Sequence, residues 1–523
     1  MHFERSSGVL LHLTSLVSHG GIGDLGPAAH DFVSFLASAK QHVWQVLPLC
    51  PTGYGNSPYA GSSAFAGNPY FISLEVLADW GWISRESIAS LSGPSGHVDP
   101  GSAGHVDFAQ VEQHKLPLLH EAAANFLQRA QHEAKLQPQW EQFRDFCHEQ
   151  SAWLADYALY AVLRREFNTG AWTAWPEPLR KRDPQALAEA SERHAKAVAQ
   201  EKVLQFAFSL QWELLRKAAA CNAIRILGDV AIFVNMDSSD VWVHPELFEL
   251  DEDLNPIRIA GVPPDYFSPT GQRWGNPLYR WDVAQQTGFA WWIERIRRAC
   301  QLYDIVRLDH FRGFEAYWAI PAEEETAVKG EWIKAPGLEL FHALESALGP
   351  LPLVAEDLGL ITPEVDALRI GLSLPGMKVL QFGFSNEGAH IHLPHRFTHD
   401  TVAYTGTHDN DTTQGWWGTA NKTERDAVEA LVGPVGGKPV WPLIRAASAS
   451  VAEMAIVPAQ DLLELGSEAR MNTPAVPAGN WSWRAPADAF TPDLAARLAA
   501  LAEVTDRDND PLGKPREESS NGV

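Results

Sequence analysis

The chain has few cysteines and a shortage of positive charge for its length. Among its 523 residues are four cysteines, Cys50, Cys147, Cys221 and Cys300, which lie far apart and form no C-x-x-C pair. This spacing argues against a disulfide framework and against a cysteine-bound zinc site, so we expect buried, reduced thiols. Lys and Arg number 41 against 65 Asp and Glu, a formal net charge of −24. An acidic surface repels nucleic acids and anionic membranes, so we expect neither as a partner and favour a neutral substrate.

The sequence also lacks an apolar run long enough to cross a bilayer. The N-terminal stretch MHFERSSGVLLHLTSLV has no basic leader and carries His12 within its apolar part, which predicts a cytoplasmic protein. Tryptophan, by contrast, is abundant, with 20 residues. An indole ring can pack in a core or stack on the apolar face of a sugar, and packing is the simpler interpretation for any single one.

Short β-rich runs alternate with segments of helical periodicity along the chain. In AAHDFVSFLASA and WWIERIRRACQLY, for example, apolar residues recur every three or four positions, as on one face of a helix. A repeated strand-helix order is typical of a parallel sheet wrapped by helices, and eight such strands predict a (β/α)8 barrel. The predicted strands are residues 8–14, 42–48, 224–232, 304–309, 352–356, 377–384, 401–408 and 454–459.

Two long insertions interrupt this pattern. We predict a single catalytic barrel over residues 1–504, with a mainly helical insertion subdomain at 75–220, after the second strand. Residues 235–285, after the third strand, are rich in Pro, Gly and aromatic residues and show little periodicity. We interpret them as an irregular cover over the active site. The polar tail at 505–523 is predicted to be frayed.

Three acidic residues follow short apolar runs that are predicted to be strands: Asp309 in IVRLDHF, Glu356 in PLVAEDLG and Asp409 in VAYTGTHDND. In a parallel barrel the carboxyl ends of the strands converge on one face, so these side chains should meet over one pocket. Three carboxylates around a pocket suggest glycosidic chemistry. Arg307 should point inward beneath Asp309 and keep it ionised, as a nucleophile requires. A purely structural Arg-Asp pair explains the same spacing.

The other two acids have alternative interpretations as well. Apolar walls and neighbouring carboxylates should raise the pKa of Glu356, which suits a general acid, although it could instead stabilise the start of a helix. Its neighbour Asp357 fits that helix role better. Asp409 crowds one turn with His408 and Asp411, which could form a metal site, a helix cap or a clamp on sugar hydroxyls. One His with loosely spaced acids is a poor metal site, so we favour the clamp and expect no metal.

Asp229, at the end of the third predicted strand, and Tyr59, after the second, are placed to complete the ring of polar residues around the pocket. For each of them the sequence signal is weak by itself.

Two motifs that could indicate other functions fail on inspection. The stretch GIGDLG at 21–26 spells the dinucleotide-binding fingerprint, but no Asp or Glu occurs from residue 32 to 74 to bind a ribose. A nucleotide-dependent oxidoreductase is therefore not favoured. The stretch DEDLN at 251–255 opens like a calcium loop, yet Pro256 replaces the required Gly and Val262 the closing Glu.

Long motifs cover nearly the whole chain, from about residue 6 to residue 484. They are SSGVLLHLTSL, PTGYGNSPYAGSSAFAGNPYFISLE, GDVAIFV, GVPPDYFSPTGQRWGNPLYRW, VRLDHFRGFEAYWAIPA, AEDLG, GTHDND and QDLLELGSEARMNTPAVPAGNWSWR. These blocks resemble the amylomaltases, or 4-α-glucanotransferases, a family of retaining barrel enzymes in the α-amylase clan. Ala231, where a proline is expected, and the run NMDSSD depart from the family pattern without touching a proposed catalytic group.

The resemblance implies a role for each candidate residue. Asp309 looks like the nucleophile, Glu356 the acid/base and Asp409 the third acid that stabilises the transition state. The resemblance also implies a group of residues around the sugar whose bond is broken: Tyr59, Asp229, Arg307 and His408. It implies that the acceptor side is covered by Tyr266, Phe267 and Trp274. Two further substrate contacts are expected from Ser57 and Asn276.

The function implied is the transfer of α-1,4-glucan segments from a donor to the 4-hydroxyl of an acceptor glucan or glucose, with α-1,4-glucans and malto-oligosaccharides as partners and no cofactor. A retaining path needs the two working carboxyl groups about 5 to 5.5 Å apart, and we predict that separation for Asp309 and Glu356. The alternatives are an α-glucan hydrolase on the same barrel and a glucan-binding protein without catalysis. The sequence predicts no particular oligomeric state.

Overall fold

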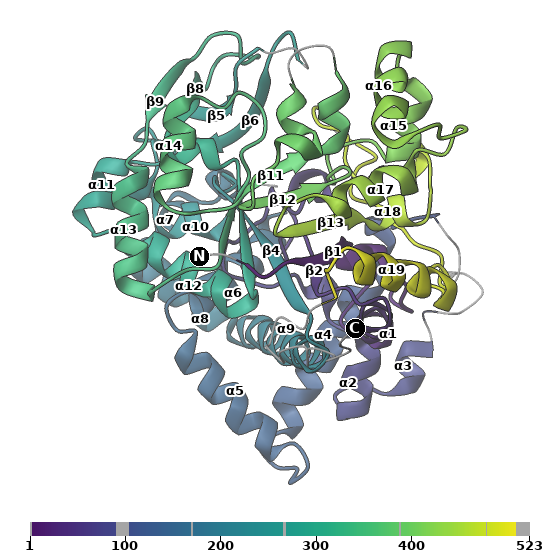
Figure 1. Ribbon diagram of the computed structural model, residues 1–523. Helices are drawn as coiled ribbons and strands as arrows, with labels where there is room; N and C mark the ends of the chain where they lie inside the picture. The colour runs from purple at the N-terminus through teal and green to yellow at the C-terminus, as the bar shows by residue number, and fades with distance from the viewer. Residues whose placement is uncertain are drawn as a thin grey trace.

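Eight parallel strands close into a barrel in the computed structural model, which describes residues 3–89, 91, 104–168, 171–264, 268–385, 389–476 and 478–508 (Figure 1). Around the barrel the strands follow one another in chain order, and the last pairs with the first. All eight predicted strands are confirmed. They are β1 (Ser6–Leu10), β2 (Val43–Gln45), β4 (Arg225–Ala231), β7 (Ile305–Asp309), β10 (Leu353–Ala355), β11 (Gly376–Val379), β12 (Thr401–Tyr404) and β13 (Met454–Pro458).

The barrel strands are apolar along nearly their whole length because both of their faces are covered. Residues pointing outward pack against helices and residues pointing inward fill the barrel, so a run such as Val43–Gln45 is fully buried. Gly228 on β4 shows how closely the outer layer approaches the sheet. A Cβ atom at this position would lie 2.1 Å from the ring of Tyr303, so only glycine fits.

Helices follow most of the strands and surround the barrel (Figure 1). Among the described residues, the connection from β11 to β12 contains only 3-10 turns: η8 (Leu380–Phe384), η9 (Ala389–His392) and η10 (Pro394–Arg396). The barrel helices are α1 (Pro27–Ser38), α12 (Ala290–Leu302), α13 (Gly337–Leu348), α14 (Pro363–Gly371), α15 (Thr413–Thr419), α16 (Lys422–Val432), α17 (Val440–Ala449), α18 (Ala459–Leu462) and α19 (Pro492–Val504).

The connection from β2 to β4 is mainly helical. It contains α2 (Leu74–Trp80), α3 (Arg85–Ala89), β3 (Gly104–His105), α4 (Phe108–Arg129), α5 (Gln137–Glu149), α6 (Leu154–Phe167), α7 (Glu177–Arg180), α8 (Pro184–Arg193) and α9 (Ala195–Cys221). The buried Lys115 of α4 ties this part to the barrel because its ammonium group lies 2.8 Å from Asp24 Oδ2. The indole of Trp212 on α9 donates to the carbonyl of Leu302 at the end of α12. The bounds 75–220 for a separate subdomain stay a prediction.

The expectation that residues 235–285 are irregular is wrong for two segments. β5 (Arg258–Val262) and β6 (Gln272–Pro277) join β8 (Ala316–Pro321) and β9 (Glu331–Lys334) in an antiparallel sheet of order β6-β5-β8-β9. The signal is hidden because β8 and β9 lie beyond β7 in the chain, and because a glycine interrupts each strand, Gly261 in β5 and Gly275 in β6. The same region contains the short helices α10 (Ser239–Val243) and α11 (Trp281–Gln286).

Residues 505–508 are held in place, so the prediction of a frayed tail fails for the part that the structure describes. The side chain of Arg507 is fully buried and donates to the carbonyls of Ser6, Ser448, Ser450, Ala452 and Glu453. These carbonyls border β1 and β13, and hydrogen bonds to them compensate the buried guanidinium for its lost water. Residues 509–523 lie outside the described part of the chain.

The remaining elements are short. They are η1 (Leu13–Ser15), η2 (Tyr54–Asn56), η3 (Pro69–Phe71), η5 (Trp172–Ala174), η6 (Pro245–Leu247), η7 (Phe311–Phe314), η11 (Ser467–Ala469) and β14 (Trp483–Arg484), which pairs with β3. No helix within the described residues is long and apolar enough to cross a membrane.

Candidate active site

Tyr59 and Asp229 come from neighbouring parts of the barrel's C-terminal face. Tyr59 lies in the loop after β2, and its hydroxyl donates to Asp229 Oδ2, on β4, over 2.7 Å. The hydroxyl oxygen of Ser57 accepts the backbone N–H of Tyr59 at 3.2 Å, so Ser57 shapes the turn that presents the ring. The structure therefore brings together Tyr59 and Asp229, two of the residues proposed from the sequence, through a direct hydrogen bond.

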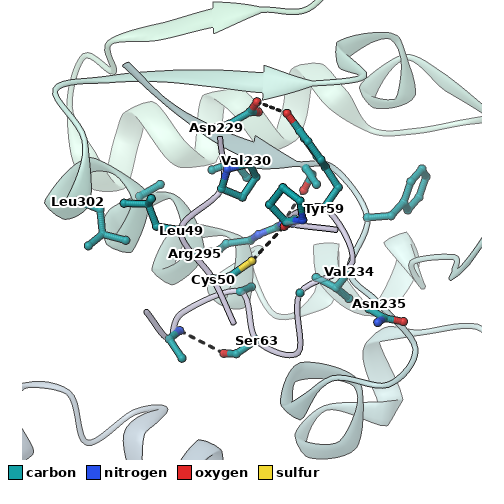
Figure 2. Close-up of a pocket in the computed structure, with 18 of the residues that line it drawn as sticks. Leu49, Cys50, Tyr59, Ser63, Asp229, Val230, Val234, Asn235, Arg295 and Leu302 are labelled. Carbon is teal, nitrogen blue, oxygen red and sulfur yellow. Dashed lines mark hydrogen bonds between the residues drawn. The ribbon is translucent and has the colours of Figure 1, made fainter. Parts of the chain in front are cut away.

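A small cavity lies behind Tyr59, between its loop, β4 and α12 (Figure 2). Its volume is about 60 Å³ and its lining includes Cys50, whose thiol donates to the carbonyl of Pro58. Since one water needs roughly 10–15 Å³ of such volume, the cavity has room for a few waters but not for a sugar. Burial raises the pKa of the Cys50 thiol to about 12, so the sulfur is neutral. The cavity therefore lies beside the candidate active site and is too small to bind the substrate.

Arg307 links two of the carboxylates. Its guanidinium lies 2.5 Å from Asp229 Oδ2 and 2.8 Å from Asp309 Oδ1, and the residue is only 3% exposed. Arg307 and Asp309 are two positions apart on β7 and point the same way, while Arg307 lies beside Asp229 of β4 in the sheet. Burial raises the pKa of Asp229, and the guanidinium opposes that rise. The same guanidinium therefore holds the carboxyl groups of Asp229 and Asp309 beside each other near the ends of neighbouring strands.

Glu356 follows β10 and is buried against the same face. Its two carboxyl oxygens lie 2.7 Å from the backbone N–H groups of His310 and Leu358. Burial raises the pKa of Glu356 to about 8, and the charge of Asp309 adds to this, while Arg307 and the two N–H groups act against it. Glu356 can therefore hold a proton near neutral pH.

His310 owes its position to an unusual backbone conformation, with φ at 52° directly after Asp309. This left-handed conformation is sparsely populated outside glycine and asparagine, and such residues cluster at functional sites. It places a backbone N–H against Glu356 and thereby connects the ends of β7 and β10.

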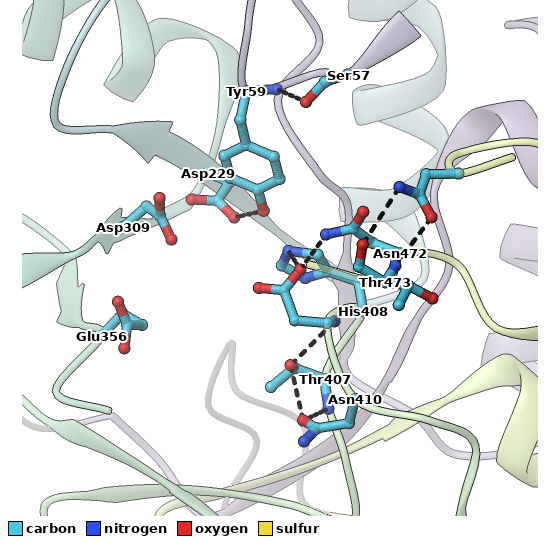
Figure 3. Close-up of polar contacts among 12 residues, drawn as sticks. Ser57, Tyr59, Asp229, Asp309, Glu356, Thr407, His408, Asn410, Asn472 and Thr473 are labelled. Atoms are coloured by element: carbon cyan, nitrogen blue, oxygen red, sulfur yellow. Dashed lines mark hydrogen bonds and ion pairs between the residues drawn. The ribbon is translucent and has the colours of Figure 1, made fainter. Parts of the chain in front are cut away.

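His408 and Asp409 lie in the loop after β12. The ring of His408 stacks on that of Tyr59, with centroids 5.2 Å apart and planes 13° apart. Burial lowers the pKa of His408, so the ring is neutral. The Asp409 carboxylate is partly exposed and accepts a hydrogen bond from Asn472 Nδ2 at 2.6 Å. Figure 3 shows Asp229, Asp309 and Glu356 around a common open space, with His408 across it.

Three residues that the sequence prediction left without a role hold the Asp409 loop. Asn472 donates its backbone N–H to the carbonyl of His408, and Arg470 Nη2 donates to the carbonyl of Asp409 at 2.7 Å. Trp481 packs its ring against both Tyr59 and His408, with centroids 5.7 and 5.9 Å away. These residues belong to the motif near the end of the chain, but nothing in their spacing indicates which loop they contact.

The predicted acceptor cover is only partly within the described residues. Trp274 on β6 is 38% exposed and lies edge-on to His310, with ring centroids 4.8 Å apart. Asn276 donates its amide to the carbonyl of Val234, so this side chain supports the backbone. Tyr266 and Phe267 lie outside the described residues. Across the part of the chain that the structure describes, no cluster of His, Cys, Asp or Glu could hold a metal ion.

Comparison with known proteins identifies the family. The profile of the 4-alpha-glucanotransferases matches residues 11–489 of this chain. The chain belongs to the 4-alpha-glucanotransferase family. One relative in this family, the 4-alpha-glucanotransferase of Thermus thermophilus, is 48% identical over 97% of this chain and 100% of its own. The 4-alpha-glucanotransferase, chloroplastic/amyloplastic, of Solanum tuberosum is 42% identical over 96% of this chain and 86% of its own.

Solved structures agree with this family assignment. The amylomaltase of Streptococcus agalactiae, solved in complex with acarbose, superimposes with a TM-score of 0.91 at 38% identity, over 97% of this chain and 100% of its own. The amylomaltase of Corynebacterium glutamicum shares the fold, with a TM-score of 0.76 at 16% identity, over 97% of this chain and 75% of its own. We therefore interpret the carboxyl groups at the C-terminal face as part of a 4-alpha-glucanotransferase barrel.

Proposed function

We propose that this chain is a 4-α-glucanotransferase that works by double displacement, with Asp309 as nucleophile and Glu356 as acid and base. The observation that carries this proposal is the contrast between the two carboxyl groups. Asp309 is partly exposed and lies 2.8 Å from the buried Arg307 guanidinium, whereas Glu356 is buried, which raises its pKa to about 8. An accessible carboxyl group beside a cation and a buried carboxyl group with a raised pKa are what retaining glycosidic chemistry needs.

In the first half of the reaction, an oxygen of Asp309 attacks the anomeric carbon of the donor glucan. Glu356 gives its proton to the glycosidic oxygen, so the bond breaks and the leaving segment departs with a free 4-hydroxyl. The product on the enzyme is a glycosyl ester of Asp309. The Asp309 side chain is 27% exposed, which leaves it accessible to a sugar at the mouth of the barrel.

In the second half, the 4-hydroxyl of an acceptor glucan or glucose attacks the same carbon. Glu356, now ionised, takes the proton of that hydroxyl, and the ester to Asp309 breaks. The N–H groups of His310 and Leu358 suit this change of role because they stabilise the carboxylate that forms when Glu356 has lost its proton. Glu356 thus alternates between a neutral form favoured by burial and an anion held by two hydrogen bonds.

Asp409 and its neighbours are proposed to hold the reacting sugar. The carboxylate of Asp409 can accept sugar hydroxyls and stabilise the positive charge that develops at the ring, while neutral His408 can donate or accept a hydrogen bond. Tyr59 offers an aromatic face that is held by Asp229 on one side and His408 on the other. Trp274, together with Tyr266 and Phe267, is proposed to shield the acceptor side from water.

The experiment that tests this function uses maltotriose as sole substrate. Transfer predicts that oligosaccharides longer than maltotriose appear together with glucose. An α-glucan hydrolase would instead release only shorter sugars, and that outcome would contradict the proposal. The Asp309→Asn variant should form neither product. Asp282→Asn should behave as the unchanged enzyme, because Asp282 is an exposed acid on α11 that pairs with Arg280 away from the proposed catalytic groups.

The substrates proposed for the chain are α-1,4-glucans and malto-oligosaccharides, in agreement with the names of its relatives. The Streptococcus agalactiae relative holds acarbose, which supports a similar site here. Reaction through two carboxyl groups requires no cofactor. We also propose a cytoplasmic location, although the Solanum tuberosum relative is described as chloroplastic/amyloplastic, so location differs within the family.

A further inference from the structure

The carboxylate of Asp237 connects the helical insertion to the active-site face of the barrel. This residue lies in the β4 loop, which we define as residues 232–238, between β4 and α10. Asp237 Oδ1 accepts hydrogen bonds from the hydroxyl of Tyr160 at 3.0 Å and from the backbone N–H of Trp172 at 3.1 Å. Asp237 Oδ2 lies 3.1 Å from Arg164 Nη2. Tyr160 and Arg164 are both on α6, so the carboxylate joins the β4 loop to that helix.

Aromatic packing strengthens this joint. The indole of Trp172 donates to the carbonyl of Met236 at 2.7 Å, next to Asp237. Directly after the loop, the buried Trp242 of α10 packs against the rings of Tyr160 and Trp175, with centroids 5.9 and 5.6 Å away. Polar and apolar contacts therefore fix the β4 loop to the insertion from both of its sides.

The β4 loop and the start of α10 also contact the loop that carries Tyr59, which we call the Tyr59 loop and define as residues 57–64. Asn235 Nδ2 donates to the carbonyl of Ala60 at 3.1 Å. The N–H of Ser239 donates to the carbonyl of Ser62 at 2.9 Å, and Asp240 Oδ2 accepts the N–H of Ala64 at 2.8 Å. The residues of the Tyr59 loop that take part in these hydrogen bonds, Ala60, Ser62 and Ala64, come shortly after Tyr59 in the chain. The β4 loop thus lies between the insertion and the Tyr59 loop and contacts both.

The cavity described above makes the position of the Tyr59 loop depend on these contacts. Figure 2 shows Val234 and Asn235 of the β4 loop, and Tyr59 and Ser63 of the Tyr59 loop, all bordering the same space. A well-packed interior would resist displacement of a loop, whereas the cavity of about 60 Å³ behind the Tyr59 loop leaves that side without close side-chain packing. Loss of the anchor would therefore allow the Tyr59 loop to shift.

We propose that the helical insertion positions Tyr59 for catalysis, with Asp237 as the positioning residue that transmits its support through the β4 loop. The inference rests on the proposed role of Tyr59 at the reacting sugar. Asp237 itself acts through Tyr59, whose ring must lie both against His408 and within hydrogen-bond distance of Asp229. A misplacement of about 1 Å in such a site can lower a rate by about a hundredfold, so a small loop shift suffices for a measurable effect.

Two adjacent arginines on α6 provide a matched pair of variants. Arg164 pairs with Asp237, whereas Arg165 lies 2.6 Å from the buried Glu201 of α9 and so stays within the insertion. Arg164→Met and Asp237→Asn should each lower kcat/KM for maltotriose about tenfold. Arg165→Met should lower the midpoint of thermal unfolding but leave kcat/KM within about twofold of the unchanged enzyme. Tyr160→Phe, which removes a single hydroxyl, serves as a milder version of Asp237→Asn.

The decisive measurement repeats Asp237→Asn in a Tyr59→Ala background. If Asp237 acts through Tyr59, the double variant should be no less active than Tyr59→Ala alone, because effects on one unit do not add. Independent, multiplying effects would overturn this proposal alone, and so would an equal loss of kcat/KM in Arg164→Met and Arg165→Met. Full activity of Tyr59→Ala would overturn the role of Tyr59 in the proposed function, and this inference with it.

Discussion

Replacing Arg307 by methionine tests how one buried guanidinium stabilises two neighbouring carboxyl groups. The guanidinium contacts Asp229 and Asp309 at 2.5 and 2.8 Å, and both Arg307 and Asp229 are almost inaccessible to water. Removing one partner of a buried ion pair typically costs about 3–5 kcal/mol because the other charge is left unpaired. Asp309 is partly hydrated and Asp229 keeps the Tyr59 hydroxyl, so we expect the low end, about 3 kcal/mol, at pH 7.

The effect must depend on pH in a defined direction. Without Arg307 the folded-state pKa of Asp229 rises further above its unfolded value of about 3.9, so the folded state binds more protons than the unfolded one. Stability then falls as pH rises between these two values. In the unchanged enzyme the pKa of Asp229 is already raised to about 7 by burial, so the two proteins bind different numbers of protons mainly above pH 7. The stability deficit of Arg307→Met relative to the unchanged enzyme should accordingly be larger at about pH 9 than at pH 7.

Urea unfolding followed by tryptophan fluorescence at both pH values measures this free energy. Arg307→Lys is the control, since it keeps the charge but cannot make both contacts at once, and it should recover part of the stability. A loss below about 1 kcal/mol at pH 7, or an equal loss at both pH values, would refute the reasoning. In the same variant kcat/KM should fall by about a hundredfold or more, because the proposed nucleophile Asp309 loses the guanidinium contact that holds its carboxyl group in place.

Three further predictions concern single groups. The kcat/KM of the unchanged enzyme should fall above about pH 8, because Glu356 must hold a proton and burial raises its pKa to about 8. A profile of kcat/KM that stays flat to about pH 10 would contradict this role. Asn472→Ala removes the 2.6 Å hydrogen bond to Asp409 and should lower kcat about tenfold while KM stays within about twofold, because Asp409 is proposed to act in the transition state. Steady-state kinetics that show only a higher KM would contradict this prediction. Arg507→Met strips buried carbonyls of their donors and should lower the free energy of unfolding by about 2–4 kcal/mol while kcat stays unchanged, and urea unfolding with no loss of stability would count against the buried contacts.

The barrel could be predicted because each of its strands is buried on both faces. A run such as Leu353–Ala355 has no polar face, so it stands out in the sequence, and the acid that follows it marks the C-terminal end of the strand. Glu356 and Asp309 were therefore placed on the same face without any knowledge of contacts. Arg307 was found for a similar reason, since side chains two apart on a strand point the same way.

Residues that act through distant contacts were not predicted. Asn472 and Asp409 are 63 positions apart, and the segment around Asn472 has no periodicity that would reveal its partner. β5 and β6 were missed because their sheet is completed by strands on the far side of β7. Arg507 lies in a polar stretch that reads as solvated, and its burial depends on backbone carbonyls, which a sequence does not display.

The glycosyl ester on Asp309 is the central claim, and trapping it is the most direct test. The Glu356→Gln variant should react with α-glucosyl fluoride, whose leaving group needs no acid, but should release the sugar slowly because the base is missing. Intact mass spectrometry of the quenched protein should then show the addition of one glucosyl unit, and peptide mapping should assign it to Asp309. Turnover of the fluoride without any adduct, or an adduct on another residue, would contradict the double-displacement account.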